Sequence, residues 1–217
     1  MKLAVINGSP RGRKSNSSRI AEWITSSLEG SVEVCHAYVS DMNRHDELIA
    51  KIGGCDYYLF IFPLYTDSMP GLSKAFMEKM EEHKGLFHAK SIAFIIHSGF
   101  PESSQSLTVE KYTRYFSSLI GMNCRGTIKM GGSEIIRSAP DAFFSDKIPA
   151  FQKIAKNIER MEPFDVEALE TISKRKKHGA FFRFIFRHID IGSIYWNRIL
   201  KKNKAYKRRF DRPYMNG

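Results

Sequence analysis

The chain has few cysteines and no long apolar run. Its 217 residues include three cysteines, Cys35, Cys55 and Cys124. Because they are odd in number and widely spaced, they indicate neither a disulfide framework nor a Cys-x-x-Cys metal or redox site. We expect buried thiols in a reducing cytoplasm. The longest nearly apolar stretch, 57–65, contains a proline and is far shorter than the roughly 18 residues that cross a bilayer.

Several signatures of targeting and catalysis are also missing. The apolar run at the start of the chain is too short for the core of a signal peptide, so we expect a cytoplasmic protein. The sequence lacks a Gly-x-Gly-x-x-Gly fingerprint, a Gly-Lys-Ser/Thr phosphate loop and a Gly-x-Ser-x-Gly elbow. It also lacks a His-x-x-x-His spacing. These absences argue against tightly held NAD, ATP hydrolysis, a serine nucleophile and a metal site.

Positive charge is present but concentrated. The net charge is +11, and residues 174–212 carry 14 lysines and arginines against only Asp190 and Asp211. The rest of the chain therefore sums to −1. This balance argues against a polyanion-binding body, and the basic character belongs to a C-terminal extension.

Short apolar stretches alternate with stretches of helical periodicity through the first 160 or so residues. This alternation predicts a three-layer α/β sandwich, because parallel strands need crossover helices. Five strands favour a flavodoxin-like parallel sheet of order 2-1-3-4-5. We expect this domain to span 1–162 and the basic, aromatic-rich extension to span 163–217. The expected strands are 2–6, 32–39, 56–62, 91–96 and 127–130, and the expected helices are 20–28, 46–52, 72–80, 109–120 and 148–161.

Ligands of such sheets bind beyond the carboxyl ends of the strands, where the strand order reverses. The loop after the first expected strand contains hydroxyls, a carboxamide and cations, and it leads into a helix. This combination suits a phosphate monoester. The plain alternative is that one of the polar residues only caps the helix. The candidate phosphate-binding residues are Ser9, Arg11, Ser15, Asn16 and Ser17.

Two further loops follow the third and fourth expected strands. In the first, two prolines stiffen the backbone and an aromatic ring and free amides suit a flat heterocycle. In the second, a glycine permits close backbone approach, and His97 is a candidate for placing charge near a ring. The candidates in these loops are Pro63, Leu64, Tyr65, Thr66, Ser68, Met69, His97, Ser98 and Gly99.

Two of these loops carry a resemblance to a known family. The run Ile6-Asn7-Gly8-Ser9-Pro10-Arg11, followed by Asn16-Ser17, resembles the first loop of the NADPH-dependent FMN reductase family. The run 63–70, with Lys74-Ala75-Phe76 and Glu78 behind it, is similar to that family's second flavin loop. Ser73 stands where the family usually has Leu, and Glu78-Lys79 replaces Asp-Arg.

The resemblance implies non-covalent FMN as cofactor and NAD(P)H as co-substrate. Hydride would pass through flavin N5 to a small-molecule acceptor such as a quinone, a flavin, or an azo or nitro compound. No side chain would be catalytic, because the flavin supplies the reactivity. The resemblance also implies a homodimer, and it implies no iron–sulfur cluster because the compact cysteine motif of some relatives is missing. A flavodoxin-type electron carrier and a binding protein without flavin are the alternatives.

The basic extension has several interpretations. The first is packing on the domain or on a partner subunit, through Phe181, Phe182, Phe184, Ile185, Phe186 and Ile189. Contact with anionic lipid is the second, and nucleic acid is disfavoured because no recognition fold surrounds the segment. Tyr195, Trp196 and Arg198 are also candidates for covering the flavin or binding NAD(P)H phosphates.

Overall fold

The computed structural model describes residues 1–174 and 191–212. The chain divides into two compact units, Met1–Arg175 and Lys176–Gly217. The predicted packing residues Phe181, Phe182, Phe184, Ile185, Phe186 and Ile189 lie outside the described residues. Packing of the extension on the domain or on a partner therefore stays a prediction.

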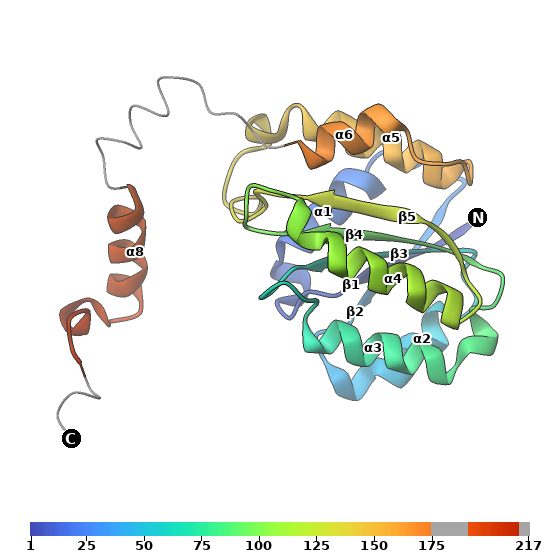
Figure 1. The fold of residues 1–217 in the computed structure, drawn as a ribbon, viewed down its shortest axis with the longest axis horizontal. Helices are drawn as coiled ribbons and strands as arrows, with labels where there is room; N and C mark the ends of the chain where they lie inside the picture. The colour runs from blue at the N-terminus through green and yellow to red at the C-terminus, as the bar shows by residue number, and fades with distance from the viewer. Residues whose placement is uncertain (175–190, 213–217) are drawn as a thin grey trace. The chain divides into compact units, whose positions relative to one another are not determined.

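A five-stranded parallel sheet forms the centre of the first unit (Figure 1). Its strands are β1 (Lys2–Asn7), β2 (Glu33–Tyr38), β3 (Tyr57–Pro63), β4 (Ser91–His97) and β5 (Asn123–Met130). The order β2-β1-β3-β4-β5 confirms the predicted fold. β5 starts earlier than predicted, because Gly126, at φ +130°, accompanies a shift in register opposite Ile92 and Ala93 that interrupts the apolar pattern.

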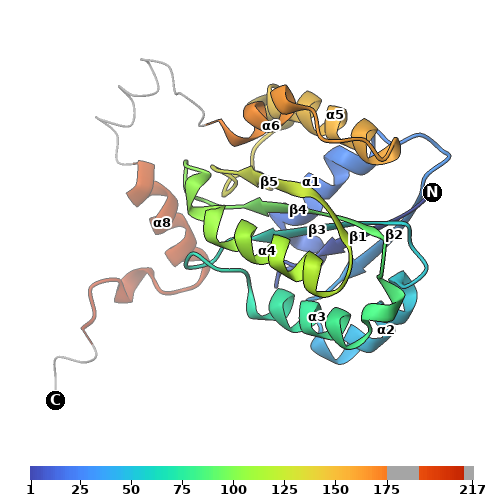
Figure 2. The same ribbon diagram turned by 45° about the vertical axis from the view of Figure 1, so that its right-hand side comes forward.

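Helices cover both faces of the sheet (Figure 2). On one face lie α1 (Asn16–Thr25), α5 (Lys147–Glu159) and α6 (Val166–Ser173), and on the other lie α2 (His45–Ile52), α3 (Gly71–Glu82) and α4 (Leu107–Leu119). Successive strand residues alternate between the two cores, as Leu59 and Phe60 do. Every residue of β3 and β4 is buried, which explains their continuous apolar sequence.

The cysteines differ from the expectation. Cys55 is buried, and burial raises the pKa of its thiol to about 11. Cys35 is partly exposed and Cys124 is exposed on β5. The prediction of three buried thiols is therefore wrong for Cys124, because the first two residues of β5 are both exposed.

A buried lysine fixes the end of the first unit. The Lys147 ammonium, at the start of α5, donates to the carbonyls of Thr171 (3.1 Å), Ile172 (2.7 Å) and Lys174 (3.1 Å). These carbonyls end α6, where the last turn has no intrahelical donors and where the helix dipole favours a cation.

Replacing Lys147 with methionine is expected to lower the free energy of unfolding by about 2 kcal/mol, because charged hydrogen bonds to buried carbonyls are lost. The urea midpoint should fall without a change in slope. Lys153→Met is the matched control, since that ammonium is exposed and pairs with Glu167 at 2.8 Å; it should cost less than about 1 kcal/mol. Equal midpoints for the two variants would contradict the prediction.

In the second unit, the described residues form α8 (Ile191–Lys202) and the short 3-10 helix η6 (Tyr206–Arg208). Among residues 1–174 and 191–212, no helix is long and apolar enough to cross a membrane.

Candidate functional site

A crevice opens where the strand order reverses, at the carboxyl ends of β1, β3 and β4. Its enclosed volume is about 140 Å³. It brings together nine of the fourteen predicted residues and two that were not predicted, Ser133 and Glu134. The predicted residues that line it are Ser9, Arg11, Asn16, Pro63, Leu64, Tyr65, His97, Ser98 and Gly99.

Asn7, the last residue of β1, organises the loop that follows it. Its buried side-chain amide donates to the Gly12 carbonyl (3.3 Å), Ser15 Oγ (3.0 Å) and Ser18 Oγ (2.8 Å). Its Oδ1 accepts from the Ser9 amide at 2.9 Å. The loop is therefore held against the strand by its own hydrogen bonds, which lowers the entropy lost on binding.

Ser15 caps α1. Its Oγ accepts from the Ser18 amide at 3.2 Å and donates to the Gly12 carbonyl at 2.6 Å. Of the two interpretations of these polar residues, phosphate binding and helix capping, capping therefore describes Ser15. The amides of Asn16 and Ser17 belong to the first turn, where no intrahelical acceptor exists, so they can bind an anion.

The side chain of Asn16 connects α1 to the loop after β5. It donates to the Ser133 carbonyl at 2.7 Å and to the Glu134 carbonyl at 3.3 Å, and it accepts from the Arg137 amide at 3.1 Å. Asn16 therefore holds the wall of the crevice with its side chain, and its backbone remains available to a ligand.

His97 lies at the bottom of the crevice between two hydroxyls. Its Nε2 lies 2.8 Å from Ser17 Oγ and its Nδ1 lies 2.9 Å from Ser133 Oγ. Burial lowers the pKa of His97 from 6.5 to about 3. The imidazole is therefore neutral at physiological pH, which corrects the idea that it places a charge there. Its two ring nitrogens hold the hydroxyls of Ser17 and Ser133 by hydrogen bonds.

The loop after β3 contains a tight turn. The Tyr65 amide donates to the Ser68 carbonyl (2.7 Å), and the Ser68 amide donates to the Tyr65 carbonyl (3.1 Å). Between them, Thr66 and Asp67 have φ values of 50° and 59°, as in a type I′ turn. The Tyr65 ring is half-exposed beside the crevice. Thr66, Ser68 and Met69 do not line the crevice, and Met69 packs against the core instead.

The loops after β4 and β5 are joined through their backbones. The Ser98 amide donates to the Met130 carbonyl (2.9 Å), and the Ser133 amide donates to the Ser98 carbonyl (2.8 Å). A Cβ on Gly131 would lie 2.3 Å from the Pro101 carbonyl oxygen, so only glycine fits this close approach. The signal that could have found Ser133 is this Gly-Gly-Ser run directly after the last strand.

Cations surround the first loop. Among the described residues, Arg11, Arg13 and Lys14 form no ion pair with a carboxylate. Arg13 lies over the Tyr38 ring, with its guanidinium carbon 4.9 Å from the ring centroid. Of the three, Arg11 lines the crevice. The crevice is therefore lined by one guanidinium, that of Arg11, which can bind an anion, and by one carboxylate, that of Glu134.

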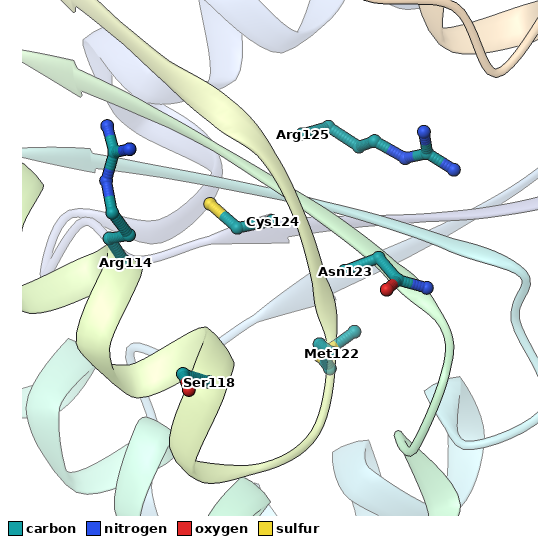
Figure 3. A pocket seen from close by; sticks show the side chains of 6 residues that line it. All are labelled: Arg114, Ser118, Met122, Asn123, Cys124 and Arg125. Atoms are coloured by element: carbon teal, nitrogen blue, oxygen red, sulfur yellow. The ribbon is translucent and has the colours of Figure 1, made fainter.

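A wider depression of about 610 Å³ lies at the other end of the sheet, around the start of β5 (Figure 3). It lies between α4 and β5, and its lining includes Arg114, Cys124 and Arg125. The smaller crevice is the better candidate site, because it lies at the carboxyl ends of the strands and contains the anion-binding groups. Within the described residues, no group of histidine, cysteine and acidic side chains could hold a metal.

Comparison with protein families gives one match. The family described as NADPH-dependent FMN reductase matches residues 1–127. This range includes the loops after β1, β3 and β4. No curated protein sequence matches the chain.

Solved structures with the same fold are distant in sequence. An NADH:FMN oxidoreductase (EMOB) in its apo form aligns with a TM-score of 0.59 and 17% identity, over 80% of this chain and 94% of that chain. An FMN-dependent NADH-azoreductase from Bacillus anthracis, in complex with FMN, aligns with a TM-score of 0.54 and 12% identity, over 73% of this chain and 100% of that chain. An NAD(P)H:quinone oxidoreductase from Methanothermobacter marburgensis aligns with a TM-score of 0.52 and 15% identity, over 73% of this chain and 97% of that chain.

Proposed function

The chain belongs to the NADPH-dependent FMN reductase family, and on that premise we propose that it is an FMN-dependent NAD(P)H oxidoreductase. The observation that carries the proposal is the loop after β1, which is preformed by Asn7 and presents a guanidinium and the start of a helix at one crevice. A phosphate dianion fits this set of donors.

The residues present suit the flavin in two parts. Ser9, Arg11 and the first amides of α1 would bind the phosphate. The isoalloxazine would lie near Tyr65, between the loops after β3 and β4, where Gly99 leaves its backbone accessible. When bound, FMN accepts hydride from NAD(P)H and passes electrons to an acceptor.

The protein's own contribution is to hold the walls of the crevice in place. His97 is buried and neutral, so its hydrogen bonds to Ser17 and Ser133 join two of these walls without placing a charged imidazolium there. The half-exposed Tyr65 leaves its side of the crevice open to a second substrate. We propose quinones, flavins, or azo or nitro compounds as acceptors. The homodimer stays a prediction.

The decisive experiment is anaerobic reduction of the purified protein. We expect a yellow protein that bleaches with NADH or NADPH and recovers its colour when a quinone is added. Protein that retains FMN but is bleached by neither nicotinamide would be the electron carrier of the alternative interpretation. Protein that binds no FMN on reconstitution would refute the proposal.

Arg11→Gln tests the phosphate site. A charge-assisted hydrogen bond contributes about 1.5–3 kcal/mol, so FMN should bind about ten- to hundredfold more weakly. Fluorescence titration of apoprotein with FMN measures the change. Arg125→Gln is the matched control, because that arginine lines the depression at the opposite end of the sheet and should leave the affinity unchanged. Equal affinities would show that Arg11 does not contact the phosphate.

A further inference from the structure

The second unit carries dense positive charge. Residues 191–212 contain eight lysines and arginines and one acid, Asp211, for a net charge of +7. Asp211 lies 4.0 Å from Arg208. One acid cannot balance eight cations, so the segment carries a large net positive charge.

The rest of the chain is close to neutral. Outside residues 174–212 the chain sums to −1. Several of its carboxylates are already paired locally, as Asp141 is with Arg19 and Glu110 with Lys129. The net charge of this body, or of a second copy of it, is therefore too small to balance the +7 of the segment. Charge complementarity therefore points to an external anionic partner.

The charged segment also presents an apolar face. At about 100° per residue, Tyr195, Trp196, Ile199 and Leu200 fall within one arc of α8, while Asn197, Arg198 and Lys201 fall on the opposite side. Tyr195 is 54% exposed and Trp196 is 61% exposed. Aromatic and aliphatic side chains on one face with cations on the other are typical of helices that lie in the interface of a bilayer.

An exposed aromatic ring beside a cation also occurs after η6, at Phe210. It is 80% exposed, and the Arg209 guanidinium carbon lies 4.6 Å from its ring centroid and 3.9 Å from that of Tyr206. A guanidinium already covers these two rings. Tyr195 and Trp196 meet edge to face at 75°. These rings do not form the parallel platform on which successive nucleic-acid bases stack.

From this arrangement we propose that residues 191–212 bind the surface of a lipid bilayer that contains anionic phospholipid. Trp196 and Tyr195 insert at the level of the headgroups, and the lysines and arginines of α8 and η6 contact the phosphates. The chain thereby places its flavin domain at a membrane surface.

Flotation with vesicles tests the proposal on the intact protein. We expect binding to vesicles of phosphatidylcholine with phosphatidylserine at about 0.1 M salt, little binding to pure phosphatidylcholine, and loss of binding at about 1 M salt. The triple variant Arg198→Glu/Lys201→Glu/Lys202→Glu should bind at least tenfold more weakly. The matched control Lys84→Glu/Lys111→Glu/Lys156→Glu changes three exposed body lysines by the same charge and should bind as the native chain does.

Tryptophan fluorescence gives an independent readout. The chain has two tryptophans, and Trp23 is buried in the first core, so a vesicle-induced blue shift should come from Trp196 and disappear in Trp196→Phe. Equal loss of vesicle binding in the body variant would overturn the proposal. So would binding to a single-stranded oligonucleotide without binding to vesicles, or a dimer that forms through the segment in place of vesicle binding.

Discussion

Gly8→Ala is expected to lower the free energy of unfolding by about 3 kcal/mol and to abolish retention of FMN. A Cβ at this position would lie 2.3 Å from Ser73 Oγ and 2.8 Å from both Phe60 Cε2 and Phe62 Cβ. None of these atoms can retreat easily. The two phenylalanines are fully buried in the core, and Ser73 Oγ is held by its hydrogen bond to the Gly8 carbonyl at 2.7 Å.

The backbone at Gly8 cannot move away without breaking the sheet. Its amide donates to the Ile61 carbonyl of β3 at 2.8 Å. A displaced Gly8 would therefore shift Ser9, whose amide is bonded to Asn7, and would move the phosphate-binding groups with it. For this reason the substitution should reduce flavin affinity and stability together.

Urea unfolding and the flavin content of the purified protein measure the two effects. Gly30→Ala is the control, because a Cβ there meets nothing within 4 Å. Adding Ser73→Ala to Gly8→Ala removes the nearest clashing atom and should restore part of the stability. A Gly8→Ala protein as stable and as yellow as Gly30→Ala would show that the contact at Gly8 is not limiting.

Acid should destabilise the protein through His97. Its pKa in the folded state, about 3, lies below the ordinary value of 6.5, so between these pH values the unfolded chain binds a proton at His97 and the folded chain does not. The contribution of the neutral, buried imidazole to the free energy of unfolding is fully present above pH 6.5 and is lost as the pH falls toward 3. At pH 5 the loss from this residue should be about 2 kcal/mol.

Unfolding measured at pH 7 and pH 5 tests this expectation. The glutamine of His97→Gln cannot be protonated. Between pH 7 and pH 5 the free energy of unfolding of this variant should therefore fall by about 2 kcal/mol less than that of the native chain. If the variant does not fold, NMR of the native chain decides the question directly. A His97 ring that is protonated in folded protein at pH 6 would refute the prediction.

The sheet and the loops at its edge could be predicted because they follow from local patterns. Continuous apolar runs such as β3 and β4 indicate buried parallel strands. Ser9, Tyr65 and Gly99 lie just after the ends of β1, β3 and β4, respectively. In the sequence, Asn7 stands out only as a member of the run that resembles the family's first loop. Its structural role depends on how the loop folds back to bring Ser15 and Ser18 to its amide, which no periodicity encodes.

Ser133 and Glu134 escaped prediction for a different reason. They reach the crevice through hydrogen bonds to Asn16 and Ser98, residues more than thirty positions away. The pKa of His97 depends in the same way on complete burial between Ser17 and Ser133. The sequence shows a histidine at a strand end, but its charge is set by tertiary packing.

The irregular β5 strand has a consequence for assembly and aggregation. β5 is an outer strand of the sheet, and within residues 1–174 and 191–212 its other side pairs with no strand. The register shift near Gly126 and the cations Arg125 and Lys129 interrupt the regular row of backbone groups that another chain would need as a template. Extension of the sheet across this edge is thereby disfavoured, so copies of the chain that associate should do so through other surfaces.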